Sequence, residues 1–257
     1  MTARDHAGAA LAGAGAGLAG GLFGVGGGIV LVPVLTGGFG LTQHQAHGTS
    51  LAVIGATALA SVFVYGAHGN VAWMTAVPVA VASVLTARYG ARWAARVSKR
   101  GLARAFAVML ALFAIRLLWR VPPASGVAVA HGWPAVALDL GIGAAVGLLA
   151  GFMGVGGGLI AVPAFTLLLG MTQQAAQGTS LAVILVTAPA GAIEHARHGN
   201  LVVRLVPALA LGAALGGPLA SWFAQGLPHE VLVRFFAVFL LVNAVVSWIR
   251  ADRPGAS

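Results

Sequence analysis

The chain has 257 residues, of which 59% are hydrophobic and only 7% are charged. A soluble domain carries roughly 25% charged residues, so this composition excludes a globular protein with water on all sides. The formal net charge is +9, but six of the basic residues cluster between two apolar segments, which is typical of a short cytoplasmic loop and not of a nucleic-acid-binding surface. These six are Arg88, Arg92, Arg96, Lys99, Arg100 and Arg104.

Two related halves make up the chain. Residues 21–70 align with residues 151–200 at a constant offset of 130, and 26 of the 50 aligned positions are identical. The shared stretches are 24–28 with 154–158, 48–54 with 178–184, and 68–70 with 198–200. The sequence therefore predicts a first membrane repeat at 1–120, a Pro-containing linker at 121–135 and a second membrane repeat at 136–257.

Each half is expected to contain the same elements in the same order: a Gly-rich apolar stretch, a polar link and three apolar spans. About 20 apolar residues cross the hydrocarbon core of a bilayer as a helix. The predicted fold is therefore an all-α polytopic membrane protein. In the first half the segments are 9–39, 42–50, 51–67, 71–92 and 102–119; in the second they are 136–169, 172–180, 181–196, 201–223 and 231–249.

The distribution of Lys and Arg predicts how the halves are oriented. If each Gly-rich stretch crosses the membrane once, the basic residues divide equally between the two sides. If each stretch re-enters and returns to its own side, the halves are inverted, and eleven of the fourteen basic residues lie in the cytoplasm. The positive-inside rule favours inverted repeats with broken or re-entrant Gly-rich helices, an architecture of transporters. One long tilted helix per stretch is the alternative.

Three consecutive glycines occur inside each Gly-rich stretch. Glycine weakens a helix by about 1 kcal/mol per residue relative to alanine, and a broken helix presents bare N–H groups and a positive dipole end that suit an anion. We expect two anion cradles near the membrane midplane; close helix packing and a flexible hinge are the alternatives. Pro33 and Pro163 support a break in each segment. The cradle residues are Gly26, Gly27, Gly28, Gly156, Gly157 and Gly158.

Hydroxyl groups precede an apolar span in each half, at Thr49 and Ser50 and at Thr179 and Ser180. Such residues either cap the following helix or face the substrate, and the two roles are compatible. We therefore include all four in the candidate substrate-binding set.

The histidine and asparagine residues between spans are candidates for gating. His68, Asn70, His198 and Asn200 belong to His-Gly-Asn sequences that are typical of tight interfacial turns, and inverted halves would place one turn at each mouth. His44 and His47 align with Gln174 and Gln177, so only the polar link of the first half offers groups that titrate near neutral pH. They are candidates for proton coupling, with surface histidines as the alternative.

No metal or cofactor site is predicted. The chain has no cysteine and only five acidic residues, and two histidines without further ligands do not make a metal site. The scarcity of carboxylates argues against cation transport and against hydrolysis by paired carboxylates. No Walker motif is present, so we do not expect this chain to use ATP.

The duplicated Gly-Val-Gly-Gly-Gly with its downstream proline, the duplicated Gly-Thr-Ser-Leu-Ala-Val and the His-Gly-Asn sequences resemble those of the sulfite exporter TauE/SafE family. The resemblance covers nearly the whole chain. It implies a multi-pass permease of the bacterial inner membrane that moves sulfite, an organosulfonate or a related small organic anion, with the lipid bilayer as its surroundings. The alternatives from other classes are a membrane-embedded enzyme and a structural or regulatory membrane subunit.

Overall fold

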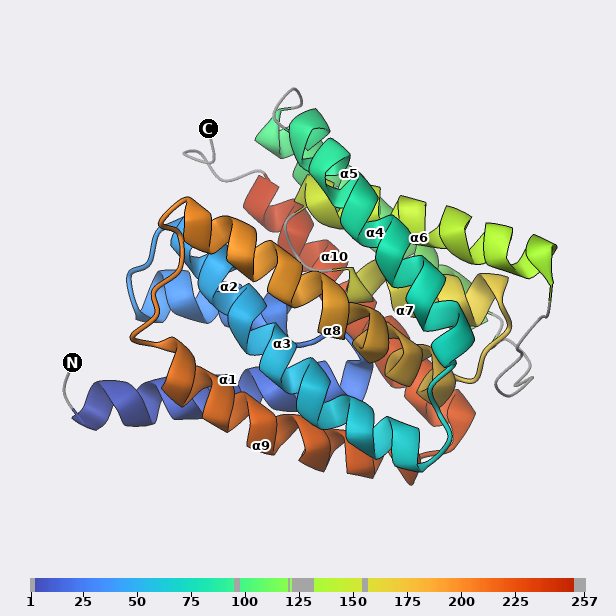
Figure 1. Cartoon of the computed structure of the whole chain (residues 1–257), viewed down its shortest axis with the longest axis horizontal. Coiled ribbons are helices and arrows are strands. Elements are labelled where there is room, and N and C mark those ends of the chain that lie inside the picture. The colour runs from blue at the N-terminus through green and yellow to red at the C-terminus, as the bar shows by residue number, and fades with distance from the viewer. Residues whose placement is uncertain (1–2, 95–97, 120, 122–131, 154–156, 252–257) are drawn as a thin grey trace.

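The computed structural model describes residues 3–94, 98–119, 121, 132–153 and 157–251. Within these residues the chain forms ten helices and no strand (Figure 1), which confirms the all-α prediction. The helices are α1 Ala3–Phe23, α2 Gly28–Gly38, α3 Gln43–Ala67, α4 Trp73–Ala94, α5 Lys99–Trp119, α6 Trp133–Met153, α7 Gly158–Leu168, α8 Gln173–Arg197, α9 Val206–Gln225 and α10 His229–Ala251.

Helix length separates candidate membrane spans from shorter elements. Among the described residues, six helices are long and apolar enough to cross a membrane: α3, α5, α6, α8, α9 and α10. Two others, α2 and α7, have only 11 residues each. A helix of that length measures about 16 Å, roughly half the hydrocarbon thickness, so neither can cross alone. The chain is therefore a multi-pass membrane protein.

The helix bounds follow the sequence repeat. Helices α6, α7 and α8 begin and end 130 residues after α1, α2 and α3. In the first half the helix is interrupted between Phe23 and Gly28. In the second half α6 ends at Met153 and α7 begins at Gly158, and residues 154–156 lie outside the described part of the chain.

The two halves interlock instead of packing as separate units. The first helix of each half packs against the fourth helix of the other, so that α1 lies along α9 and α4 along α6 (Figure 1). Glycines spaced four residues apart make this approach close. A Cβ atom on Gly17 would lie 2.5 Å from the carbonyl oxygen of Ala213, and one on Gly147 would lie 2.3 Å from that of Ser83. Small residues allow such backbone contact between membrane helices.

Helices α3 and α8, which carry the most similar sequences, run antiparallel through the interior. Gly48 near the start of α3 contacts Asn200 just after α8, and Gly178 near the start of α8 contacts Asn70 just after α3. Equivalent helices therefore point in opposite directions. The orientation of the halves relative to the membrane stays a prediction.

The predicted polar links are wrong, because residues 43–50 and 173–180 are already helical. Thr42 is the N-cap of α3: its hydroxyl accepts a hydrogen bond from the amide of Gln45, whose side chain bonds back to Thr42. Thr172 caps α8 in the same way through the amide of Ala175. The capping role considered for Thr49, Ser50, Thr179 and Ser180 is therefore wrong; their small buried side chains are placed by tertiary packing.

Two further boundaries differ from expectation. Helix α6 begins at Trp133, three residues before the predicted start of the second repeat at 136, and residues 122–131 of the predicted linker lie outside the described residues. Pro33 and Pro163 lie inside α2 and α7 and do not end them.

Candidate functional site

The first glycine break is a turn that only glycine adopts easily. Gly24, Gly26 and Gly27 have φ angles of 69°, 74° and 86°, in the left-handed region where a side chain is strained. The turn reverses the chain, because Gly26 packs against Gly20 and Gly27 against Ala16. Helix α2 therefore starts in the buried interior and leads back along α1, as a re-entrant segment would (Figure 1).

Hydroxyl groups bind the carbonyl oxygens at the C-terminal end of α1. Tyr65 of α3 lies 2.9 Å from the Gly21 oxygen, and Ser180 of α8 donates to the Gly24 oxygen at 2.8 Å. Ser221 of α9 lies 3.4 Å from the Gly21 oxygen, but its shorter contact, at 2.8 Å, is with the carbonyl of Gly217 in its own helix. A buried carbonyl without a partner is costly. Ser180, a predicted substrate residue, thus holds the break of the other half in place.

The backbone amides at the start of α2, unlike these carbonyls, have no hydroxyl partner among the described residues. Gly27 is the N-cap and has no side chain to accept a hydrogen bond. Within the described residues, no acceptor is recorded for the buried N–H groups of Gly26, Gly27 and Gly28. The first turn of a helix carries a partial positive charge on such groups. The three predicted cradle residues of the first half therefore form a buried, electropositive turn.

Gly158, at the start of α7, packs against the first break in the interior. A Cβ atom on Gly158 would lie 2.7 Å from the Cα of Val25 and 3.0 Å from the carbonyl oxygen of Gly24. Gly157 and Gly158 are buried, as Gly27 is, but Gly157 has a φ of −67° where Gly27 has 86°. Gly156 lies outside the described residues. The described parts of both predicted cradles are therefore adjacent but differ in backbone conformation.

The predicted threonines bind backbone, and they do so identically in both halves. Thr49 Oγ1 accepts a hydrogen bond from the amide of Val202 at 3.1 Å, and Thr179 Oγ1 accepts one from the amide of Ala72 at 3.0 Å. Each threonine is fully buried and joins the start of one long helix to the segment after the His-Gly-Asn turn of the other half. Ser50 donates to the carbonyl of His47 in its own helix.

The His-Gly-Asn sequences form the tight turns that were predicted. Gly69 and Gly199 have φ angles of 71° and 70°, and the amides of Asn70 and Asn200 bond the carbonyls five residues earlier, at Tyr65 and His195. This is the Schellman pattern that ends a helix. His68 and His198 are exposed, and the side chain of Asn70 bonds Gln225. A gating role for these residues stays a prediction.

Histidines gather at one end of the α3–α8 pair. His44 and His47 lie in the first two turns of α3, and His195 and His198 lie at the end of α8 beside them, with His195 against Gly48. At the other end the equivalents of His47 and His195 are Gln177 and Tyr65, which bond each other. The proximity of His195 to His44 and His47 was missed from the sequence, because it depends on the antiparallel packing.

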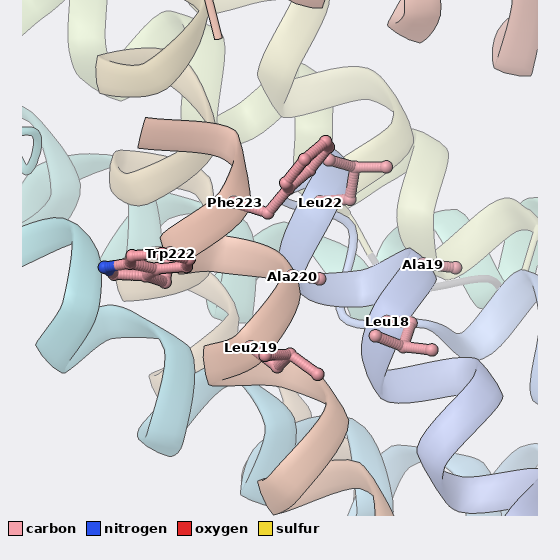
Figure 2. A pocket seen from close by; sticks show the side chains of 7 residues that line it. All are labelled: Leu18, Ala19, Leu22, Leu219, Ala220, Trp222 and Phe223. Carbon is pink, nitrogen blue, oxygen red and sulfur yellow. The ribbon is translucent and has the colours of Figure 1, made fainter. Parts of the chain in front are cut away.

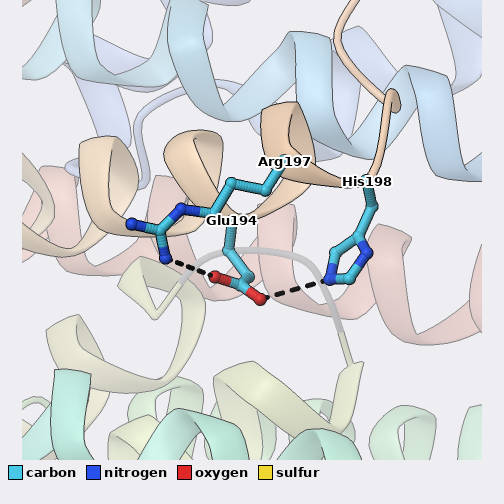
Figure 3. A network of polar contacts seen from close by, with 3 residues as sticks. All are labelled: Glu194, Arg197 and His198. Carbon is cyan, nitrogen blue, oxygen red and sulfur yellow. Dashed lines mark hydrogen bonds and ion pairs between the residues drawn. The ribbon is translucent and has the colours of Figure 1, made fainter.

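Two acidic residues, Glu194 and Asp139, have their recognised contacts away from the first glycine break. Glu194 is exposed, and its carboxylate contacts Arg197 at 3.4 Å and His198 at 3.2 Å (Figure 3). Asp139 is buried in α6 and hydrogen-bonds Thr75 of α4. Among the described residues, no three His, Cys, Asp or Glu side chains are grouped so that they could hold a metal ion.

A cavity of about 360 Å³ lies between α1 and α9 on the outside of the helix bundle (Figure 2). Its lining offers no polar side-chain group except the indole of Trp222, so it does not suit an anion. It is separate from the glycine breaks. The lining residues are Leu18, Ala19, Leu22, Leu219, Ala220, Trp222 and Phe223.

Comparison with known proteins identifies the relatives of this chain. The family model described as "Sulfite exporter TauE/SafE" matches residues 2–117 and 138–257. A "Probable membrane transporter protein" of Xylella fastidiosa is 27% identical over 227 residues, 86% of either chain, and "Probable membrane transporter protein YunE" of Bacillus subtilis is 27% identical over 218 residues, 79% of this chain and 80% of the relative.

A "Probable membrane transporter protein" of Haemophilus influenzae is 34% identical over 128 residues, which cover 46% of this chain and 48% of that relative. No solved structure matches the chain.

Proposed function

Because the chain belongs to the sulfite exporter TauE/SafE family of membrane transporters, we propose that it moves a small anion across the bacterial inner membrane and binds it at the two glycine breaks. The observation that carries the proposal is the buried turn at Gly26, Gly27 and Gly28, whose amides have no recorded acceptor among the described residues. An anion is the partner that such amides and the positive end of a helix favour.

Binding by backbone amides fits the rest of the interior. Among the described residues, the buried polar side chains include hydroxyls and amides but no Lys or Arg. Backbone N–H groups bind an oxyanion through charge-assisted hydrogen bonds, so binding does not require a buried Lys or Arg. The hydroxyls of Thr49, Ser50, Thr179 and Ser180 would then act mainly by fixing the helices around the breaks.

The proposed substrates are sulfite, an organosulfonate or a related small organic anion, in line with the name of the family. These anions share a compact group of oxygens around a small centre. Backbone N–H groups that converge at a helix start can bind such oxygens without a specific side chain. This chemistry does not require a cofactor or a metal.

We propose inverted repeats as the basis of alternating access. The antiparallel run of α3 and α8 supports this arrangement, as does the short α2, which begins at a turn packed against α1. Broken helices that meet near the midplane between inverted halves are a recurrent design of secondary transporters. The proposal also includes gating by the turns at His68, Asn70, His198 and Asn200, and proton coupling through His44 or His47.

Two other classes are disfavoured as alternatives. A membrane-embedded enzyme would need a cluster of ligands or nucleophiles, whereas the described residues around the breaks offer backbone groups, hydroxyls, apolar side chains and the amide side chain of Gln177, which packs against Gly24. A structural or regulatory subunit would not need bare amides in its interior. We therefore propose that the chain is not an enzyme.

Flux through proteoliposomes tests the proposal. The purified protein should accelerate uptake of sulfite or of a small organosulfonate above that of protein-free vesicles, with saturation and with competition between the two anions. A small organic cation of similar size should cross no faster than in protein-free vesicles. Saturable cation flux without anion flux would overturn the proposal.

A further inference from the structure

Two isoleucines occupy equivalent positions at the centre of the molecule. Ile54 is the twelfth residue of α3 and Ile184 the twelfth of α8, and each of these helices has 25 residues. Because the two helices are antiparallel, their midpoints lie at the same depth in the interior. Each isoleucine is only 2% exposed.

Both isoleucines contact the glycine breaks. A Cβ atom on Gly26 would lie 2.5 Å from Cγ2 of Ile54 and 3.6 Å from Cγ2 of Ile184, and one on Gly158 would lie 2.9 Å from Cδ1 of Ile184. The first break therefore has both side chains against it, and Ile184 also reaches the second. We call these two residues the isoleucine pair.

The isoleucine pair covers the polar turn with branched apolar groups. Bare amides need water, an anion or another acceptor, and an unsatisfied buried amide costs free energy. Rings of apolar side chains exclude water and ions from a narrow passage until they separate. Both isoleucine side chains stand against Gly26, in the middle of the turn that carries these amides.

We propose that the isoleucine pair closes the first glycine break in the present conformation and sets the size of the anion that this break admits. This inference rests on the proposed function, because it assumes that the breaks bind the substrate. It adds two residues that determine specificity through shape, although neither offers a hydrogen bond.

The neighbouring valines provide a matched control. Val53 and Val183 are also equivalent in the repeat, lie one residue away on the same helices and are 1% and 2% exposed. Neither contributes one of the nearest atoms to a described glycine of the breaks. Truncation at these positions disturbs the core without opening the breaks, so it separates a packing effect from an effect on access.

The first experiment measures size selectivity in proteoliposomes. Truncation by Ile54→Ala and Ile184→Ala should raise the flux of a larger organosulfonate, relative to that of a smaller one, by roughly tenfold, since a few methyl groups in an apolar site discriminate on this scale. The milder changes Ile54→Val and Ile184→Val should shift the ratio in the same direction if the alanine variants do not fold. An equal shift in Val53→Ala and Val183→Ala would overturn the inference.

The second experiment does not depend on which anion is transported. The chain has no cysteine, so Ile54→Cys, Ile184→Cys and Val53→Cys each carry a single thiol. A small sulfonate-bearing methanethiosulfonate reagent should label the first two in membranes and leave Val53→Cys unlabelled. Unlabelled Ile54→Cys and Ile184→Cys in a protein that still transports anions would overturn the inference. Labelling of Ile54→Cys and Ile184→Cys in a protein that shows no anion flux would mean that water reaches the isoleucine pair. That result would overturn the proposed function and not the inference about the pair.

Discussion

The hydroxyl oxygen of Tyr65, near the end of α3, lies 2.9 Å from the side-chain oxygen of Gln177, near the start of α8. The same hydroxyl lies 2.9 Å from the carbonyl oxygen of Gly21 in α1, so one buried side chain joins three helices at the first break. The repeat equivalents of Tyr65 and Gln177 are His195 and His47. At one end of the α3–α8 pair, the phenol of Tyr65 therefore contacts the side-chain amide of Gln177. At the other end, the equivalent positions carry the imidazoles of His195 and His47.

Replacement of Tyr65 by phenylalanine should destabilise the protein. The change Tyr65→Phe removes a buried hydroxyl and leaves polar groups without it, which costs about 1–3 kcal/mol. Thermal unfolding in detergent measures the loss. The matched control is Tyr89→Phe on α4, because Tyr89 is exposed and should tolerate the change. Equal unfolding temperatures for the two variants would show that the Tyr65 contacts contribute little.

Alanine at Gly48 or Gly178 should impair folding strongly. A Cβ atom at these positions would lie 2.2 Å from the Asn200 oxygen and 2.1 Å from the Asn70 oxygen, and the obstacle is backbone. Overpacking of this kind typically costs about 1–3 kcal/mol. The yield of monodisperse protein after extraction is the measurement. Gly66→Ala, where no atom lies within 4 Å of the added carbon, should give the yield of the unmodified chain.

The threonine contacts predict matched effects in the two halves. Both Thr49→Val and Thr179→Val keep the side-chain shape and remove the acceptor of one backbone amide, that of Val202 or Ala72. Each should lower the free energy of unfolding by about 1–3 kcal/mol. A stability loss confined to one half would argue that the two contacts are not equivalent in the membrane.

Single cysteines test the inverted topology. His68 and His198 are both exposed and lie in equivalent turns. We expect an impermeant thiol reagent added to intact cells to label His68→Cys and to leave His198→Cys unlabelled until the membrane is opened, because the basic residues near Arg197 favour the cytoplasm. Labelling of both from the outside would reject inverted halves.

Proton coupling is tested by the double change His44→Gln and His47→Gln, which copies the glutamines of the second half. Flux should lose its dependence on pH between about pH 5 and 8, where histidine titrates. The groups nearby are His195, His198 and Glu194, which remain in the variant. His6→Gln, at an exposed site on α1, is the control. An unchanged pH profile in the double variant would remove His44 and His47 from the mechanism.

Hydrophobicity and the repeat predicted the class of fold because both are properties of local sequence. The start of α3 was also readable, since Thr42 and Gln45 have the spacing of a capping box; the polar character of residues 43–50 suggested a link instead. Their burial against the other half explains the helix, and no local signal reports that burial.

The sequence pattern could not predict which residues each motif contacts. Thr49 bonds the amide of Val202 and Gly48 contacts Asn200 because α3 and α8 are antiparallel neighbours. The aligned motifs showed that both halves carry the same sequences. They did not show that the residues of each motif make their contacts with the other half. The isoleucine pair was equally hidden, since buried apolar residues look alike until a contact distinguishes them.

The packing of α1 against α9 also has a consequence for biosynthesis. Helix α1 ends at Phe23 and α9 begins at Val206, so the ribosome must add about 180 residues before the partner of α1 exists. At roughly 5–20 residues per second this takes about 10–35 s. During that interval Gly13, Gly17 and Gly21 of α1 lack the α9 backbone against which they pack, and the nascent chain cannot reach its final arrangement before α9 has been made.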